Sequence, residues 1–162
     1  MAGVRARSIF TIAVTIAAAL MLTIFPLPDW AQPYRPQWPL MVLAYWSMAL
    51  PLRVGVFAGW VTGLFTDVIT GALLGHHALG YALAIYVVLA VHRRLRLYPW
   101  WQQAAAVGGV LGLERIVSFL VIGATTGEAP TWQYWLSPLV GTLLWPWVFV
   151  ILRDVRRKFR VR

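Results

Sequence analysis

The sequence predicts an all-α membrane protein built as a bundle of about six transmembrane helices. Hydrophobic residues make up 60% of the 162-residue chain and charged residues only 12%, whereas soluble proteins contain roughly 45–50% and about 25%. A soluble domain of this length could not hide so much apolar surface, because small domains keep a large share of their area in water. The charged residues also cluster at the ends of long apolar runs, as is typical of membrane-spanning helices.

The apolar runs define the expected spans. A spanning helix needs about 20 mostly apolar residues, because each residue adds 1.5 Å towards a hydrocarbon layer roughly 30 Å thick. The expected spans are residues 8–25, 38–52, 54–75, 78–91, 100–126 and 132–152, within one integral membrane domain (1–162) that ends in a basic tail (153–162). Spans 38–52 and 78–91 are short, which leaves open a five-span bundle with one re-entrant or tilted helix.

The first apolar run could also be read as a signal peptide, because it follows Arg5 and Arg7. Its uncharged stretch from Ser8 to Pro28 is longer than a typical signal core, and no clean small-x-small site follows it. We therefore expect it to be retained as the first span. The connector after it contains five prolines, which predict a stiff, extended segment.

The positions of the basic residues predict the topology. With six crossings, 12 of the 14 Lys and Arg residues fall on the side of the two termini, and the exceptions are Arg35 and Arg115. Cytoplasmic loops carry an excess of Lys and Arg, so both termini are expected in the cytoplasm. The net charge of +9 does not indicate nucleic acid binding, because the charges sit in short clusters at span ends.

A stripe of glycines runs along the third expected span. With Asp67, it places a small or acidic residue at every fourth position: Gly55, Gly59, Gly63, Asp67, Gly71 and Gly75. Glycines four residues apart clear one side of a helix, so a neighbouring backbone can approach closely. Two interpretations stay open: packing inside the bundle, or a docking groove for a partner helix.

Asp67 lies within an apolar span, where a carboxylate is costly and usually faces the bundle interior, water or a polar partner. It is either a ligand-binding or proton-handling group, or a helix-end carboxylate that caps the turn through Gly71. His76 and His77 follow nearby, but neighbouring histidines on a helix point about 100° apart and no fourth ligand is in view. We expect solvated loop histidines and no metal site or cofactor.

Glu114 and Arg115 lie near the middle of the fifth expected span. Their opposite charges lower the cost of insertion into the membrane. Because neighbouring side chains on a helix diverge, each is expected to find further partners on other helices. They form either the floor of a polar pocket or a polar contact between helices.

The tail concentrates the positive charge. It carries six basic residues in ten positions, and the candidate contact residues are Arg153, Arg156, Arg157, Lys158 and Arg160. Near an anionic leaflet each basic residue contributes about 1 kcal/mol. The tail is therefore expected to contact the lipid bilayer, with a cytoplasmic partner as the alternative.

The sequence lacks the usual catalytic signatures: it contains no GxSxG, Walker A or HExxH motif and no cysteine. Only Asp67 and Glu114 are acidic within the expected spans, and neither has an obvious base or nucleophile beside it. We expect a protein that is not an enzyme.

These motifs together resemble the MreD family of rod shape-determining proteins. The matching residues extend from Arg53-Val54-Gly55-Val56 through the glycine stripe to Gly75-His76-His77-Ala78-Leu79. Further matches are Arg94 to Pro99, Gln102-Gln103, Leu144 to Trp147, and the connector residues Arg35-Pro36-Gln37-Trp38.

The resemblance implies a non-enzymatic component of the bacterial inner membrane that acts in cell elongation. Expected partners are the transmembrane helix of MreC, the actin-like MreB, the RodA polymerase and a class B penicillin-binding protein. It also implies a fold similar to the substrate-binding subunits of energy-coupling-factor transporters. A rival function is therefore a small-molecule-binding subunit of such a transporter, with an outward-opening pocket lined by Asp67 and Glu114.

Overall fold

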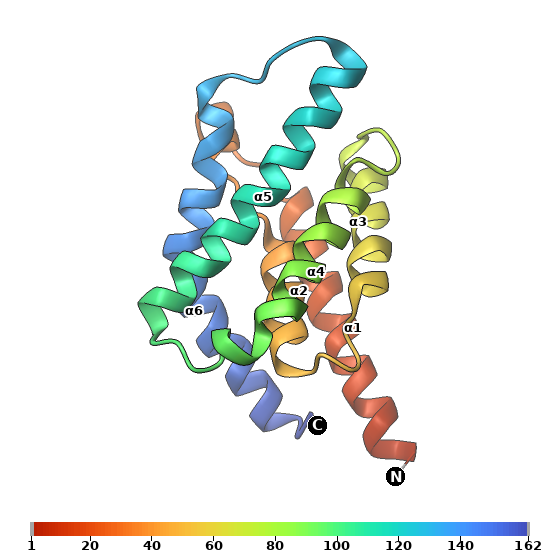
Figure 1. The fold of residues 1–162 in the computed structure, drawn as a ribbon. Coiled ribbons are helices and arrows are strands. Elements are labelled where there is room, and N and C mark those ends of the chain that lie inside the picture. Colours follow the sequence, from red (N-terminus) through yellow and green to blue (C-terminus); the bar gives the residue numbers. More distant parts are fainter. Residues whose placement is uncertain (1, 162) are drawn as a thin grey trace.

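The computed structural model describes residues 2–161, with side chains from Ala6 onwards. The described chain is helical, with no strand, and forms six α-helices with two short 3-10 helices (Figure 1). In order they are α1 (Ala2–Ile24), η1 (Asp29–Tyr34), α2 (Trp38–Ala49), α3 (Val56–Thr70), α4 (His76–Leu95), α5 (Trp100–Thr126), η2 (Trp132–Trp135) and α6 (Leu136–Lys158).

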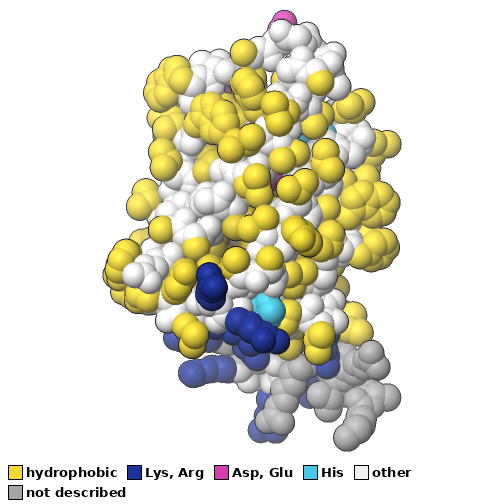
Figure 2. Space-filling model, in the orientation of Figure 1, with side chains coloured by type: hydrophobic (Ala, Val, Ile, Leu, Met, Phe, Trp, Pro, Cys, Tyr) yellow, Lys and Arg dark blue, Asp and Glu magenta, His cyan; other side chains and the backbone are white. Residues whose placement is uncertain are grey.

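Four stretches of the bundle are long and apolar enough to cross a membrane: Ala6–Ile24, His76–Leu95, Trp100–Thr126 and Trp132–Lys158. The shorter helix α3 is also apolar. Large hydrophobic side chains such as Phe57, Leu120 and Leu143 point outwards, and Figure 2 shows apolar side chains over the visible flank. The chain is a multi-pass membrane protein, and the prediction of an all-α membrane bundle is confirmed.

Helix α2 occupies the centre of the bundle. It has 12 residues, so it is about 18 Å long and cannot cross a hydrocarbon layer of roughly 30 Å. Ten of those residues are buried, and α2 contacts α1, α3, α4, α5 and α6. A helix that is hydrophobic all round belongs in an interior. The expected span 38–52 is thus an enclosed core helix and does not face lipid.

Helix α4 also differs from its expected span, 78–91, which seemed too short to cross. It runs from His76 to Leu95, because its first turn includes both histidines and its last turn continues into Arg93 and Arg94. The prediction that either of two spans was incomplete therefore applies to α2 and not to α4.

Hydrogen bonds from buried indole groups join neighbouring helices of the core. The indole Nε1 of the fully buried Trp46 donates to Thr15 Oγ1 of α1 at 2.9 Å. A second buried indole, Trp145 Nε1 of α6, donates to Gln103 Oε1 of α5 at 3.2 Å. Each buried indole N–H thus has a partner, as large buried aromatic groups require.

Two glycines of the stripe explain the close contact between α3 and α4. A Cβ at position 63 would lie 2.6 Å from the Ala78 nitrogen and 2.7 Å from the His77 oxygen, and one at position 59 would lie 3.1 Å from the Tyr81 oxygen. Their spacing therefore serves packing inside the bundle. Gly55 borders open space and does not contribute to this contact.

The other two glycines form the turn between these helices. Gly71 and Gly75 have φ angles of 67° and 97°, which side-chain-bearing residues rarely adopt. Helix α3 consequently ends at Thr70 and not at Gly75, where the expected span ended.

Both termini lie at the same end of the bundle (Figure 1), and Figure 2 shows Lys and Arg side chains gathered there. We call this the basic end. The turn between α3 and α4 and the segment between α5 and α6 lie at the opposite end.

The α3–α4 contact predicts that an added methyl group lowers the stability of the protein at Gly63 but not at a glycine outside the contact. Gly63→Ala should destabilise the protein by about 1–3 kcal/mol, because the methyl group meets the backbone of α4. Gly123→Ala on α5 is the matched control, since its Cβ meets nothing within 4 Å and alanine favours a helix. Thermal unfolding in detergent measures both, and equal melting temperatures would contradict the packing role of Gly63.

Candidate functional site

Asp67 caps the start of α4. The side chain is fully buried and accepts hydrogen bonds from the backbone nitrogens of Gly75 at 2.9 Å, His77 at 2.8 Å and Ala78 at 3.4 Å. The N-terminus of a helix presents unpaired N–H groups and a partial positive charge, so a carboxylate there is stabilised. This contact closes the α3–α4 turn and gives Asp67 a structural role.

The two histidines are not solvated loop residues, contrary to our expectation. His76 is only 9% exposed, and His77 Nδ1 lies 2.9 Å from Asp67 Oδ1. Both belong to the first turn of α4, whose backbone N–H groups bond to the carboxylate, and this turn holds their rings against the bundle. No group of three or more His, Cys, Asp or Glu side chains in residues 2–161 could hold a metal ion.

Glu114 and Arg115 lie beside a small polar cavity near the N-terminus of α2. The cavity has a volume of about 160 Å³, and its lining includes Gln37, His77 and Tyr81. Asp67 is not part of the lining, because its carboxylate is occupied by the turn. The structure therefore does not bring the carboxylates of Asp67 and Glu114 into one pocket.

The partners of this pair are only partly those expected. Arg115 reaches other elements: its Nη2 donates to Ser137 Oγ of α6 at 3.0 Å, and its guanidinium lies 4.5 Å from the centre of the Tyr134 ring. Glu114 instead accepts from Ser118 of its own helix at 2.7 Å. The two charged groups approach to 4.0 Å while Glu114 is 1% exposed, so each offsets part of the desolvation cost of the other.

Several buried polar atoms around the cavity have no hydrogen-bond partner within the described protein: Glu114 Oε2, Arg115 Nε, Arg35 Nε, and both amide atoms of Gln37. Buried polar groups of this kind are normally satisfied by water or a ligand. The cavity is thus a polar chamber, and its size suits a few water molecules.

The connector residue Arg35 closes this chamber. Its guanidinium donates to the carbonyls of Thr23 and of Phe25, the latter at 2.9 Å, so it neutralises the C-terminal end of α1. Its own carbonyl accepts from Ser137 at 2.6 Å. The two basic residues that lie away from the basic end, Arg35 and Arg115, therefore meet at Ser137.

A second row of small residues lies on the outer face of α5. Ala105 and Gly109 are exposed, Gly112 is half-buried, and a Cβ at either glycine would meet nothing within 4 Å. The spacing i, i+4, i+7 places them on one side of the helix. This row was not predicted from the sequence, although its spacing is visible there, because the glycine stripe of α3 is the longer and more regular pattern.

The tail is helical and not a free extension. Helix α6 continues to Lys158, and Arg153, Arg156, Arg157 and Arg160 line a second cavity at the basic end. Lys158 lies at the end of the helix outside that lining.

Comparisons with known proteins agree over almost the entire chain. A family model described as "rod shape-determining protein MreD" matches residues 4–155. The rod shape-determining protein MreD of Haemophilus influenzae is 34% identical over 152 residues, which cover 94% of this chain and 94% of that protein. No solved structure matches the chain, so the likeness to energy-coupling-factor transporter subunits stays a prediction.

The capping role of Asp67 can be tested with a single amide. Asp67→Asn should lower the free energy of unfolding by about 2 kcal/mol, because an amide keeps one acceptor oxygen where the carboxylate uses two. Asp29→Asn, in the exposed 3-10 helix, is the matched control and should change little. Thermal melting in detergent gives the comparison. Unchanged melting of Asp67→Asn would exclude the structural role and reopen a role in proton handling.

Proposed function

Because the chain belongs to the MreD family of rod shape-determining proteins, we propose that it is a non-enzymatic membrane scaffold of the cell-elongation machinery. Family membership supports a role in cell shape. In the proposed arrangement the bundle binds the spanning helix of MreC. It thereby holds MreB filaments close to the RodA polymerase and a class B penicillin-binding protein that build side-wall peptidoglycan.

The row on α5 carries the docking part of this proposal. Ala105, Gly109 and Gly112 leave a shallow, apolar strip along a helix that is long enough to cross the membrane. In lipid no hydrophobic force drives helices together, so close backbone approach at small residues is a main source of association. Gly59 and Gly63 are unsuitable for this purpose, because α4 already covers them.

The orientation follows from the basic end. The basic loops and tail gather at one end of the bundle (Figure 2), which the positive-inside rule assigns to the cytoplasm of a bacterial inner membrane. Arg35 and Arg115 do not weaken this assignment, because both are bonded within the protein. MreB would then bind at the basic end, and the synthases would contact the sides of the bundle within the membrane.

The small size of the polar chamber argues against the rival function, a small-molecule-binding subunit of a transporter. Its volume of about 160 Å³ lies below the roughly 300–1,000 Å³ of typical ligand pockets. Its walls are joined by contacts of Arg35 and Ser137, which would have to separate to admit a vitamin-sized molecule.

The docking surface can be tested by filling it. Gly109→Leu and Ala105→Leu, expressed in a rod-shaped host that lacks its own MreD, should give rounded cells. They should also reduce co-purified MreC by about tenfold, which corresponds to about 1.4 kcal/mol of binding energy. Leucine at these exposed helical positions should not lower the melting temperature, because it meets open space and favours a helix.

Ala18→Leu is the matched control, because Ala18 is an exposed alanine on α1, a helix that does not pack against α5. Cells with this variant should stay rod-shaped and retain MreC. Normal shape and normal MreC recovery in Gly109→Leu would show that α5 is not the docking helix.

A further inference from the structure

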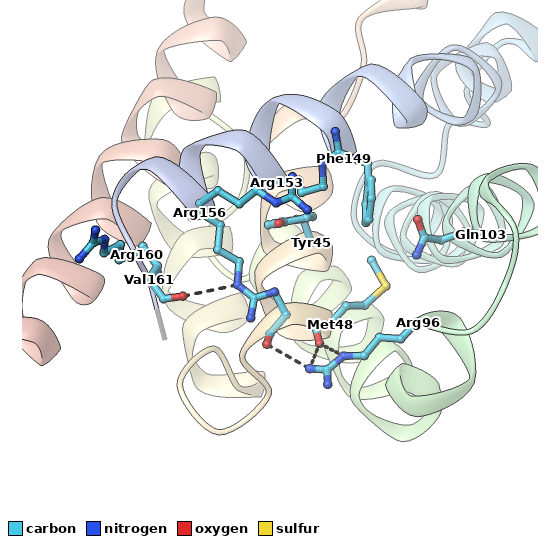
Figure 3. A pocket seen from close by; sticks show the side chains of 11 residues that line it. Tyr45, Met48, Arg96, Gln103, Phe149, Arg153, Arg156, Arg160 and Val161 are labelled. Carbon is cyan, nitrogen blue, oxygen red and sulfur yellow. Dashed lines mark hydrogen bonds between the residues drawn. The ribbon is translucent and has the colours of Figure 1, made fainter.

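The basic end contains a cavity much larger than the polar chamber. Its volume is about 830 Å³, and it lies at the C-terminal end of α2, where Met48 and Ala49 form part of its wall. Figure 3 shows Arg96 below the end of α2, while Arg153, Arg156 and Arg160 come from α6 and the residues after it. We call it the basic pocket.

Five arginines line the basic pocket: Arg96, Arg153, Arg156, Arg157 and Arg160. Arg96 is bonded to the last carbonyls of α2, including Met48 at 2.6 Å and Ala49 at 3.0 Å. Among the described residues the only acidic side chain paired with any of them is Asp154, an exposed contact of 3.4 Å to Arg153. The pocket therefore carries a large excess of positive charge that the protein does not balance.

The tail is folded to create this arrangement. After α6 the backbone makes a Schellman turn: Val161 N donates to Arg156 O at 3.0 Å, and Arg160 N donates to Arg157 O at 3.2 Å. Arg160 occupies the left-handed position with φ 49°, where glycine is usual. The turn seats Val161 in the core at 2% exposure, so the arginines are held at the pocket by packing.

The position of the pocket favours a lipid over a soluble anion. The apolar part of α6 ends at Leu152, and Arg153 follows directly, so the guanidiniums stand at the level of lipid headgroups. The inner wall is formed by apolar groups of Met48 and Phe149. A phosphate group alone would leave most of the 830 Å³ unfilled.

We propose that the basic pocket binds the headgroup of an anionic lipid that carries two phosphate groups. Guanidinium groups bind phosphate oxygens through paired, charge-assisted hydrogen bonds. A lipid with two phosphate groups can bind several arginines of α6 at once. A lipid with a single phosphodiester carries only one negative charge, whereas the pocket is lined by five arginines. The apolar wall accommodates the glycerol and the first carbons of the chains.

The test uses the full-length protein in detergent, with bound lipid measured by native mass spectrometry. The probes are cardiolipin with two phosphates, phosphatidylglycerol with one, zwitterionic phosphatidylcholine, and inorganic pyrophosphate as a soluble competitor. We expect cardiolipin to bind most tightly and to remain bound in the presence of pyrophosphate. Equal binding of cardiolipin and phosphatidylglycerol, or displacement of cardiolipin by pyrophosphate, would overturn the proposal.

Two matched pairs of substitutions distinguish lipid binding in the pocket from general attraction to the positive charge of the basic end. Arg157→Gln combined with Arg160→Gly removes two guanidiniums that make no hydrogen bond in the described chain, and glycine suits the left-handed turn. This pair should reduce cardiolipin affinity by about tenfold or more without lowering the melting temperature of the lipid-free protein. Arg93→Gln with Arg94→Gln removes the same charge outside the pocket and should have no such effect. Equal losses in both pairs would mean that the lipid responds only to net charge.

Discussion

The burial of one short helix shapes the rest of this bundle. Helix α2 is only about 18 Å long, yet it stands in the middle of a protein that spans a layer of roughly 30 Å. Both of its ends therefore lie within or close to the membrane, where unpaired backbone groups are costly. The polar chamber forms at its N-terminal end, and the basic pocket forms at its C-terminal end, where Arg96 binds the last carbonyls.

Close packing around α2 determines which small residues remain available. Helix α4 covers Gly59 and Gly63 of α3, and the buried Asp67 holds the connecting turn in place. The row on α5, with Gly109 at its middle, remains open. Because association in lipid depends on close backbone approach, a row of this kind is suited to contact with a partner helix.

The two cavities differ in ways that bear on function. The polar chamber is small. Hydrogen bonds among Arg35, Arg115 and Ser137 hold its walls together and link the connector, α5 and α6. It resembles a structural junction more than a pocket for a diffusing ligand. The basic pocket is large, open and unbalanced in charge. The scaffold proposed above would need stable contact with the leaflet at that end, and the folded tail is suited to provide it.

The sequence by itself determined the all-α membrane class, the common side of the termini and the family, because hydropathy, charge position and motif order are local properties of the chain. It did not reveal that α2 is enclosed by the other helices, because an apolar run reads the same whether lipid or protein surrounds it. Spacing likewise could not decide that Gly63 faces α4 while Gly109 faces outwards, or that His76 is buried. Those outcomes depend on which helix faces pack together, and only the tertiary structure specifies them.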